Sequence, residues 1–105
     1  TVRLIERDDE TALPWARDRY ACVIFNLHVE HGNTERSADD FRALIDLALA
    51  RGGSYFLTYH RWARREQVES AYPRFAAFLR EKLRIDTRER FTSDWYRHYK
   101  AMFAA

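Results

Sequence analysis

The chain has few of the residues that fix a small fold by covalent or backbone constraint. Its 105 residues include one cysteine, Cys22, three glycines and two prolines. A single thiol cannot form an internal disulfide, and Cys22 stands inside an apolar run, so we interpret it as a buried, unreactive thiol. No run approaches the ~20 apolar residues that span a bilayer, and no basic segment precedes an apolar one at the N-terminus. The sequence therefore predicts a protein without a membrane span, suited to a reducing cytoplasm.

An excess of charge of one sign is also lacking. Lysine and arginine number 18, aspartate and glutamate number 16, and the formal net charge is +2. This small difference gives no field that would hold nucleic acid or an anionic membrane by electrostatics alone. Glycine-rich phosphate-binding motifs are absent too, so no backbone segment is predicted to cradle a phosphate.

Large side chains are abundant instead. The chain carries seven Phe, six Tyr and three Trp, and 47% of its residues are hydrophobic. A domain of this size buries roughly two thirds of the surface of its unfolded chain, and one small core does not need so many rings. We therefore expect part of the apolar surface to face a partner. The chain also begins at Thr1 within a strand-like phrase, which we interpret as the sign of a piece of a longer protein.

Three segments have the composition of β-strands. Residues 1–7 alternate weakly, and the acids and the proline of the segment 8–14 end that strand. Residues 20–29 are rich in β-branched and aromatic types, and every second residue from Val23 to Val29 is apolar, which gives this strand one wholly apolar face. Gly52-Gly53 introduces a short aromatic strand over residues 54–58.

Helical spacing is found in most of the rest of the chain. Ser37 followed by acids predicts an N-cap, and a helical face then runs to Gly52 with apolar residues at Phe41, Leu44, Ile45 and Ala48. We expect two more helices, over 66–72 and from Pro73 onward, and an irregular tail after Asp86. These elements predict an α+β fold, with a mixed or antiparallel sheet, helices on one of its faces and a helical C-terminal segment.

Asn26 and His28 are candidate ligand-binding side chains of the second strand. Because they are two residues apart on a strand, they point the same way. They face either a substrate or solvent, where the strand leaves the core. His28, Glu30 and His31 do not make a metal site, because a strand sends His31 to the opposite face and no fourth ligand is spaced nearby. No metal site is predicted.

Two other groups contain residue types that bind or catalyse. Arg61, Arg64 and Arg65 surround Trp62 and could stack on bases or bind phosphates, but a solvated helix start beside an interface tryptophan explains them better. The stretch 93–98 contains a serine, an aspartate and a histidine, yet no nucleophile turn surrounds its serine. We expect neither nucleic-acid binding nor triad chemistry.

Several short motifs occur in a fixed order over the second half of the chain. They are Gly52-Gly53 before an aromatic strand, Tyr72-Pro73 at a helix start, Lys82 before Asp86, Phe91, and Ser93-Asp94. This order and spacing resembles the C-terminal end of FAD-linked oxidases of the vanillyl-alcohol-oxidase type. That family includes the sugar-lactone and alditol oxidases and decaprenylphosphoryl-ribose oxidase, and its members are several times longer than this chain.

The resemblance implies that the chain is the C-terminal part of an FAD-dependent oxidoreductase. Residues 1–55 would end the cap domain that holds the substrate, and residues 56–105 would return to pack on the FAD-binding domain. That N-terminal domain, outside this chain, would bind most of the FAD. The parent would oxidise an alcohol carbon of a sugar-like or other hydroxylated substrate by hydride transfer to flavin, and Asn26 and His28 would contact that substrate. The isolated piece is expected to be inactive.

One departure from these relatives concerns catalysis. Where they carry a lysine on the strand that crosses to the flavin domain, this chain has Tyr59, so His60 or Arg61 would have to supply positive charge beside the flavin. A second departure, Asp86-Thr87 in place of Asp-Pro, changes only a turn.

The two faces of the predicted crossing strand decide between these residues. Alternation puts Leu57 and Tyr59 on one face, with Arg61 next along it, and puts His60 on the other face with Phe56 and Thr58. We favour the Tyr59 face, with the Tyr59 hydroxyl as hydrogen-bond donor to the cofactor and Arg61 as the cation. His60 is the alternative catalytic residue.

A hypothesis from another class is a free-standing small α+β binding or oligomerisation module that catalyses nothing. Under either hypothesis we expect self-association, because rings without a covering domain tend to be buried against another copy. The rings that we expect to be partly uncovered are those of Phe75, Phe78, Trp95, Tyr96 and Tyr99.

Overall fold

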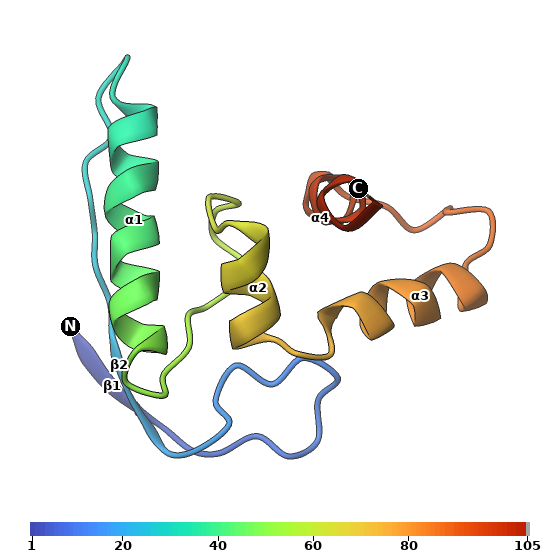
Figure 1. The fold of residues 1–105 in the computed structure, drawn as a ribbon, viewed down its shortest axis with the longest axis horizontal. Coiled ribbons are helices and arrows are strands. Elements are labelled where there is room, and N and C mark those ends of the chain that lie inside the picture. The colour runs from blue at the N-terminus through green and yellow to red at the C-terminus, as the bar shows by residue number, and fades with distance from the viewer. Residues whose placement is uncertain (105) are drawn as a thin grey trace.

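The structure, a computed structural model, describes residues 1–104 and consists of two strands followed by four helices (Figure 1). The elements are β1 (Val2–Ile5), β2 (Tyr20–Val23), α1 (Thr34–Leu49), α2 (Arg65–Ala71), α3 (Phe75–Ile85) and α4 (Asp94–Ala104). The strands lie at one side of the molecule, and α3 and α4 lie at the other. This arrangement confirms the predicted α+β fold and its helical C-terminal segment.

The sheet is a two-stranded antiparallel ribbon. Of the two predicted arrangements, mixed and antiparallel, the second is therefore correct. Val2 lies opposite Val23 and Ile5 lies opposite Tyr20, and the amide of Ile24 donates to the carbonyl of Thr1 at 2.8 Å. The prediction of a strand over 20–29 is therefore wrong in its length. Residues 24–29 have no strand beside them within the described chain, and an extended segment counts as a strand only when a ladder satisfies its backbone groups.

Helix α1 begins earlier than predicted. Its N-cap is Asn33 rather than Ser37, and the amide of Ser37 donates to the Asn33 carbonyl at 3.1 Å as part of the first turn. Gly32, at φ +87°, reverses the chain just before the helix, so the helix can begin as soon as this turn ends. The predicted apolar face is correct, because Ile45 is buried and the other three positions are half-buried.

The aromatic segment after α1 is not a strand. Gly52, at φ +71°, and Gly53, whose amide donates to the carbonyl of Ala48 at 2.8 Å, end the helix. Residues 54–64 then follow an irregular path between α1 and α2 (Figure 1). The prediction of a strand over 54–58 is wrong because side chains, and not a neighbouring strand, bind the carbonyls of this segment.

The three C-terminal helices supply half of the residues of the core cluster. Helix α2 agrees with its prediction, and α3 begins at Phe75, two residues after Pro73. The prediction of an irregular tail after Asp86 is wrong for α4, whose N-terminus is capped by the Ser93 hydroxyl, which accepts from the amide of Tyr96 at 3.1 Å. The buried cluster consists of Ile45, Leu57, Ala63, Val68, Ala71, Tyr72, Phe75 and Tyr99.

The C-terminal rings are covered more fully than the sequence predicts. Phe75, Tyr96 and Tyr99 are buried, at 1%, 6% and 0% exposure, and only Phe78 and Trp95 remain partly exposed. They are covered because α4 brings Trp95, Tyr99 and Phe103 within 5.0 to 5.7 Å of the Phe75 ring. The expected source of self-association is therefore not at these rings.

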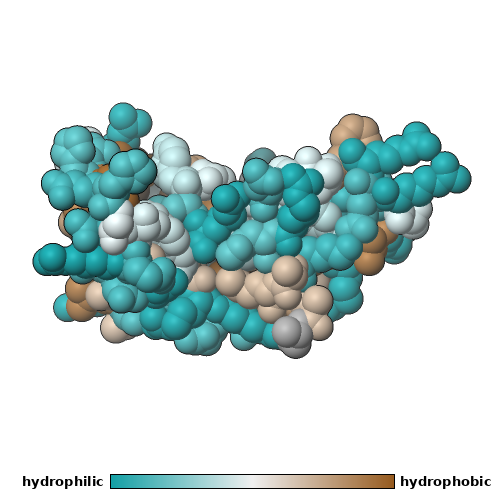
Figure 2. Space-filling view, turned by 90° about the horizontal axis from the view of Figure 1, so that it is seen from above, coloured by the Kyte–Doolittle hydropathy of each residue, from teal (hydrophilic) through white to brown (hydrophobic). Residues whose placement is uncertain are grey.

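Exposed apolar side chains are instead concentrated after β2. The apolar run 23–29 consists of Val23, Ile24, Phe25, Leu27 and Val29, which are each between 36% and 54% exposed. The face in Figure 2 is mostly hydrophilic, with apolar groups in small patches. None of the described helices is both long enough and apolar enough to cross a membrane.

Candidate functional site

The central loop, which we define as residues 52–62, is held by side chains from four different parts of the fold. Each donates a hydrogen bond to a loop carbonyl, and each comes from or directly follows a different element: β2, α1, α2 or α4. The pairs are Tyr20 Oη to Gly52 at 3.0 Å, Arg42 Nε to Trp62 at 2.8 Å, Tyr72 Oη to Tyr55, and Trp95 Nε1 to Leu57 at 3.2 Å. A loop without regular structure is thereby fixed in one conformation, which is typical of loops that carry function.

Apolar contacts fix the middle of the loop. Leu57 is buried at 6% exposure and belongs to the core cluster. Phe56 remains 44% exposed, and its ring lies 5.8 Å from that of Trp15. Leu57 thus fixes the loop to the core at the residue whose carbonyl Trp95 binds.

The phenol of Tyr59 is exposed at the surface of the loop, where a partner can reach it. It is 85% exposed, and its ring lies edge-on to Phe56 at 5.3 Å. Tyr59 and Leu57 therefore do not share a face, contrary to the predicted alternation, because the loop turns between them instead of continuing as a strand. The phenol is held by one ring contact, and its hydroxyl makes no hydrogen bond with the described residues.

Arg61 lies on the surface near the first turns of α4. It makes no hydrogen bond or ion pair with residues 1–104, yet it is close enough to act on three groups of α4. After the larger effect of burial, its charge lowers the pKa of His98. After the hydrogen bond from Arg97, it also helps to hold the pKa of Asp94 below its ordinary value. The Arg61 guanidinium is thus a surface cation that remains available to a ligand.

His60 has surroundings of a different kind. Its ring lies 4.2 Å from the ring of Phe41 and stacks on Trp62 at 4.6 Å. Its Nδ1 atom is buried and has no hydrogen-bond partner in the described part of the chain. Burial lowers the pKa of His60, so the imidazole is neutral at pH 7. Of the two candidates for the cation, Arg61 has the charge and the exposure, and His60 has neither.

Asn26 and His28 lie away from the other predicted site residues. Both are exposed and belong to the segment that follows β2. Figure 1 shows this segment on one side of α1 and the central loop on the other. The structure therefore groups Tyr59, His60 and Arg61 on one loop but does not bring Asn26 and His28 to them.

Two buried tyrosine hydroxyls, one in the loop and one in α4, were not predicted from the sequence. The hydroxyls of Tyr55 and Tyr99 are buried next to each other, and neither finds another hydrogen-bond partner within residues 1–104. Burial raises the pKa of both, and Arg61 partly opposes this for Tyr99. The spacing of Trp95, Tyr99 and Phe103 could have placed Tyr99 on the inner face of a helix. The position of its hydroxyl next to Tyr55 depends on the path of the loop, which no local pattern gives.

The basic cluster at Trp62 is mostly neutralised. Arg64 pairs with Asp46 at 2.9 Å and with Glu66 at 2.8 Å, and Arg65 pairs with Glu69 at 3.0 Å. A nucleic-acid interface needs cations that are free to meet phosphates, so these contacts favour the interpretation of a solvated, ion-paired helix start.

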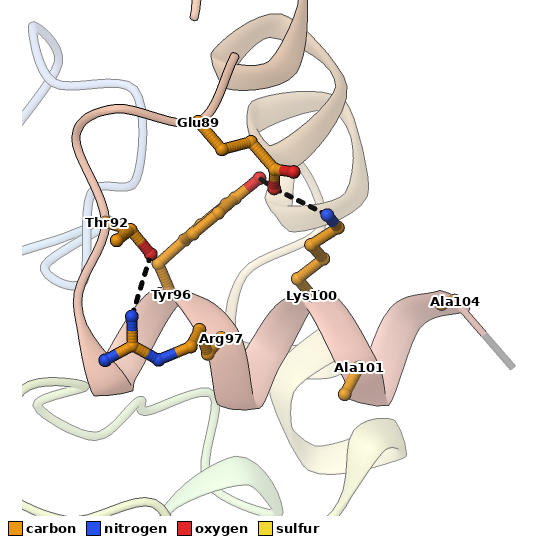
Figure 3. Close-up of a pocket in the computed structure, with 7 residues that line it drawn as sticks. All are labelled: Glu89, Thr92, Tyr96, Arg97, Lys100, Ala101 and Ala104. Carbon is orange, nitrogen blue, oxygen red and sulfur yellow. Dashed lines mark hydrogen bonds and ion pairs between the residues drawn. The ribbon is translucent and has the colours of Figure 1, made fainter. Parts of the chain in front are cut away.

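A hollow of about 480 Å³ lies beside α4 and not at the loop (Figure 3). Glu89 crosses it and accepts from the Tyr96 hydroxyl at 2.9 Å and from Lys100 at 2.5 Å. Arg97, on its other side, donates to Thr92 at 3.3 Å and to Asp94 at 2.6 Å. The cations here already have partners, so the hollow offers a ligand little unpaired charge. Over residues 1–104, no group of three or more His, Cys, Asp or Glu side chains is placed to hold a metal ion.

No family model, curated protein or solved structure matches this chain. The relationship to FAD-linked oxidases therefore stays a prediction from the motifs between Gly52 and Asp94.

Proposed function

We propose that the chain is the C-terminal part of an FAD-dependent oxidoreductase that oxidises an alcohol carbon of a sugar-like or other hydroxylated substrate. One observation carries the proposal. The central loop is fixed by donors from four parts of the fold, and it presents Tyr59 and Arg61 unpaired at the surface. Tyr59 stands where the resembling family carries its catalytic lysine. A rigid loop with an exposed donor and cation fits a surface that completes a site on another domain.

The residues of the loop fit the edge of a flavin in their chemistry. When bound by the N-terminal domain of the same protein, FAD would accept the hydride that leaves the alcohol carbon. The Tyr59 hydroxyl would donate a hydrogen bond, and Arg61 would place a positive charge, where negative charge develops on the cofactor. Both groups are exposed and neither has a hydrogen bond or an ion pair with the described residues to give up, which keeps the cost of turning them toward a ligand low.

His60 has a supporting role in this proposal. As a neutral ring packed against both Phe41 and Trp62, it fixes the loop on α1 next to the two displayed residues. Asn26 and His28, on the far side of α1, are proposed to contact the substrate from the cap domain, since both side chains are exposed.

The proposal is tested on the natural protein that contains these residues. An antibody raised against the 105-residue chain is used to isolate it, and its mass and its flavin absorbance are measured. We expect a protein several times heavier than 12.6 kDa that carries flavin. A flavin-free product of 12.6 kDa would contradict the proposal and favour the free-standing binding module, a function that the exposed apolar run 23–29 also suits.

The roles of the loop residues are tested by stopped-flow flavin reduction in that protein. Loss of a donor or charge aimed at the developing negative charge costs on the order of 3 kcal/mol, or about a hundredfold in rate. We expect Tyr59→Phe and Arg61→Ala each to slow reduction by up to this factor. Thr58→Ala, an exposed change on the same loop, serves as the control. Parental rates in both variants, together with a strong loss in His60→Ala, would show that the other side of the loop meets the flavin.

A further inference from the structure

The outer edge of β2 and of the segment that follows it has no strand paired with it within residues 1–104. In an antiparallel ladder the backbone amides of one strand point alternately to its two edges. The amide of Ile24 points to β1, because it donates to the Thr1 carbonyl at 2.8 Å. A continuation of the β2 alternation through residues 24–29 places the amides of Phe25, Leu27 and Val29 at the opposite, outer edge. They make no hydrogen bond with the described residues.

This edge lacks the features that normally prevent pairing. The ten residues from Tyr20 to Val29 include no lysine, arginine, aspartate, glutamate or proline. Native edge strands are usually protected by such residues or by a covering element. The apolar run 23–29 instead remains between 36% and 54% exposed. An uncharged apolar edge of this length is a surface for strand addition.

We propose that a second copy of this chain pairs with the outer edge, antiparallel and related by a two-fold axis at Asn26. In this register the residue numbers of two opposite residues, one from each copy, add up to 52. The apolar face meets its own copy, with Val23 opposite Val29 and Phe25 opposite Leu27. The result is a four-stranded sheet in which residues 23–29 of the two copies form the central pair and β1 lies on the outside of each copy.

The choice of register follows from the polar residues. At the two-fold axis the Asn26 amides of the two copies lie side by side, and each can donate to the other. A shift by one residue would place Phe25 opposite Asn26 and mix the apolar and polar faces. Charge also permits the pairing, because Glu30 falls opposite Cys22 and no like charges meet within the ten residues. This inference goes beyond the proposed function and does not depend on it. The two roles of Asn26 are compatible, because the contact between copies uses one N–H and the oxygen of each amide and leaves the second N–H for a ligand.

Analytical ultracentrifugation of the 105-residue chain between ~1 and ~100 µM tests the inference. We expect a monomer–dimer equilibrium that Leu27→Lys weakens at least tenfold, because it puts a charge at the centre of the interface. Phe91→Lys is the matched control, since Phe91 is 84% exposed but lies outside the edge, and it should leave the equilibrium unchanged. Circular dichroism verifies that both variants are folded.

Amide exchange measured by NMR at low and high concentration identifies the edge. The amides of Phe25, Leu27 and Val29 should become protected as the dimer forms, while those of Asn26 and His28, which point to the β1 side, stay fast. A monomer at ~100 µM, a dimer that persists in Leu27→Lys, or protection at Asn26 and His28 instead would each overturn the inference. None of these outcomes bears on the flavin content of the natural protein, which is measured separately.

Discussion

Tyr59 and His60 are neighbours in sequence with opposite surroundings. The phenol is 85% exposed, and the imidazole packs against two aromatic rings. The same contrast separates Leu57, which is buried, from Phe56, which is 44% exposed. Such differences arise where backbone carbonyls are bound by side chains, because each carbonyl then turns toward its own donor instead of alternating along a ladder.

Two tyrosines that bind loop carbonyls allow a matched test at the residue scale. The Tyr72 hydroxyl donates to Tyr55 in a partly buried place, and the Tyr20 hydroxyl donates to Gly52 in an exposed one. Tyr72→Phe leaves a carbonyl without a partner and away from water, so we expect a loss of about 1–3 kcal/mol in the free energy of unfolding. Tyr20→Phe leaves a carbonyl that water can reach, and we expect a loss under ~0.5 kcal/mol. Urea unfolding at a concentration where the chain is monomeric measures both, and equal losses would contradict this account.

The candidate site could be predicted from the sequence only in part. The position of Tyr59, His60 and Arg61 on one segment follows from their adjacency, and the exposure of Arg61 follows from its charge. Which of Tyr59 and His60 is displayed could not be predicted, because alternation on a strand does not apply to this loop. The distance of Asn26 and His28 from the loop depends on how α1 packs, a tertiary feature without a local signal.

At the scale of elements, prediction succeeded for a helix with regularly spaced apolar residues. It failed for segments that form a strand only if a neighbouring strand pairs with them. The apolar positions from Phe41 to Ala48 predicted α1, since helical hydrogen bonds are local. Residues 24–29 have the composition of a strand, but the described chain gives them no neighbour. Helix α4 was missed although its Ser93 cap is a readable signal.

The connection between α3 and α4 depends on Asp86. Its carboxylate accepts from Lys82 at 2.7 Å and from the amides of Arg90 and Phe91 at 2.9 and 3.0 Å. Lys82 also lies 4.2 Å above the Tyr96 ring of α4. The hydrogen bond from Lys82, helped by the two amides, lowers the pKa of Asp86 below its ordinary value. One side chain thus joins the end of α3 to the turn that leads to α4.

This lowered pKa predicts how stability depends on pH. Because the unfolded carboxyl takes up a proton at a higher pH than the folded one, the stabilisation is complete above the ordinary pKa and is lost as pH falls through the folded value. We expect the melting temperature to fall between about pH 5 and pH 3, and to fall less in Asp86→Asn. Asp40→Asn is the control, since Asp40 is exposed and makes no hydrogen bond or ion pair with the described residues. Parallel pH profiles for the parent and Asp86→Asn would contradict the assignment.

At the scale of the whole molecule, the core lies among the helices, and the longest run of exposed apolar side chains follows the second strand. The core cluster draws on α1, the central loop, α2, α3 and α4, and on neither strand. Composition predicted an excess of apolar surface, but it placed that surface on the C-terminal rings. The structure differs because α4 covers most of those rings, while the apolar side chains of the run 23–29 stay exposed.

A prediction about the cofactor also belongs to this scale. The chain has no glycine-rich phosphate-binding motif, and the hollow beside α4 is lined by cations that already have partners. We expect the 105-residue chain alone to bind FAD weakly or not at all. Titration with free FAD should show no saturable change in flavin fluorescence, and a dissociation constant below ~1 µM would contradict the assignment of the main cofactor site to another domain.

The four donors of the central loop also set an order of events during synthesis. Tyr20 and Arg42 precede the loop carbonyls that they bind, whereas Trp95 is joined to the growing chain 38 residues after Leu57. A ribosome that has just completed the loop has therefore not yet made the indole that binds its middle carbonyl. The surface that displays Tyr59 and Arg61 matures only when α4 has left the exit tunnel and folded back. Nascent chains stalled before Trp95 should thus carry this loop in a proteolytically more accessible form than chains released after it.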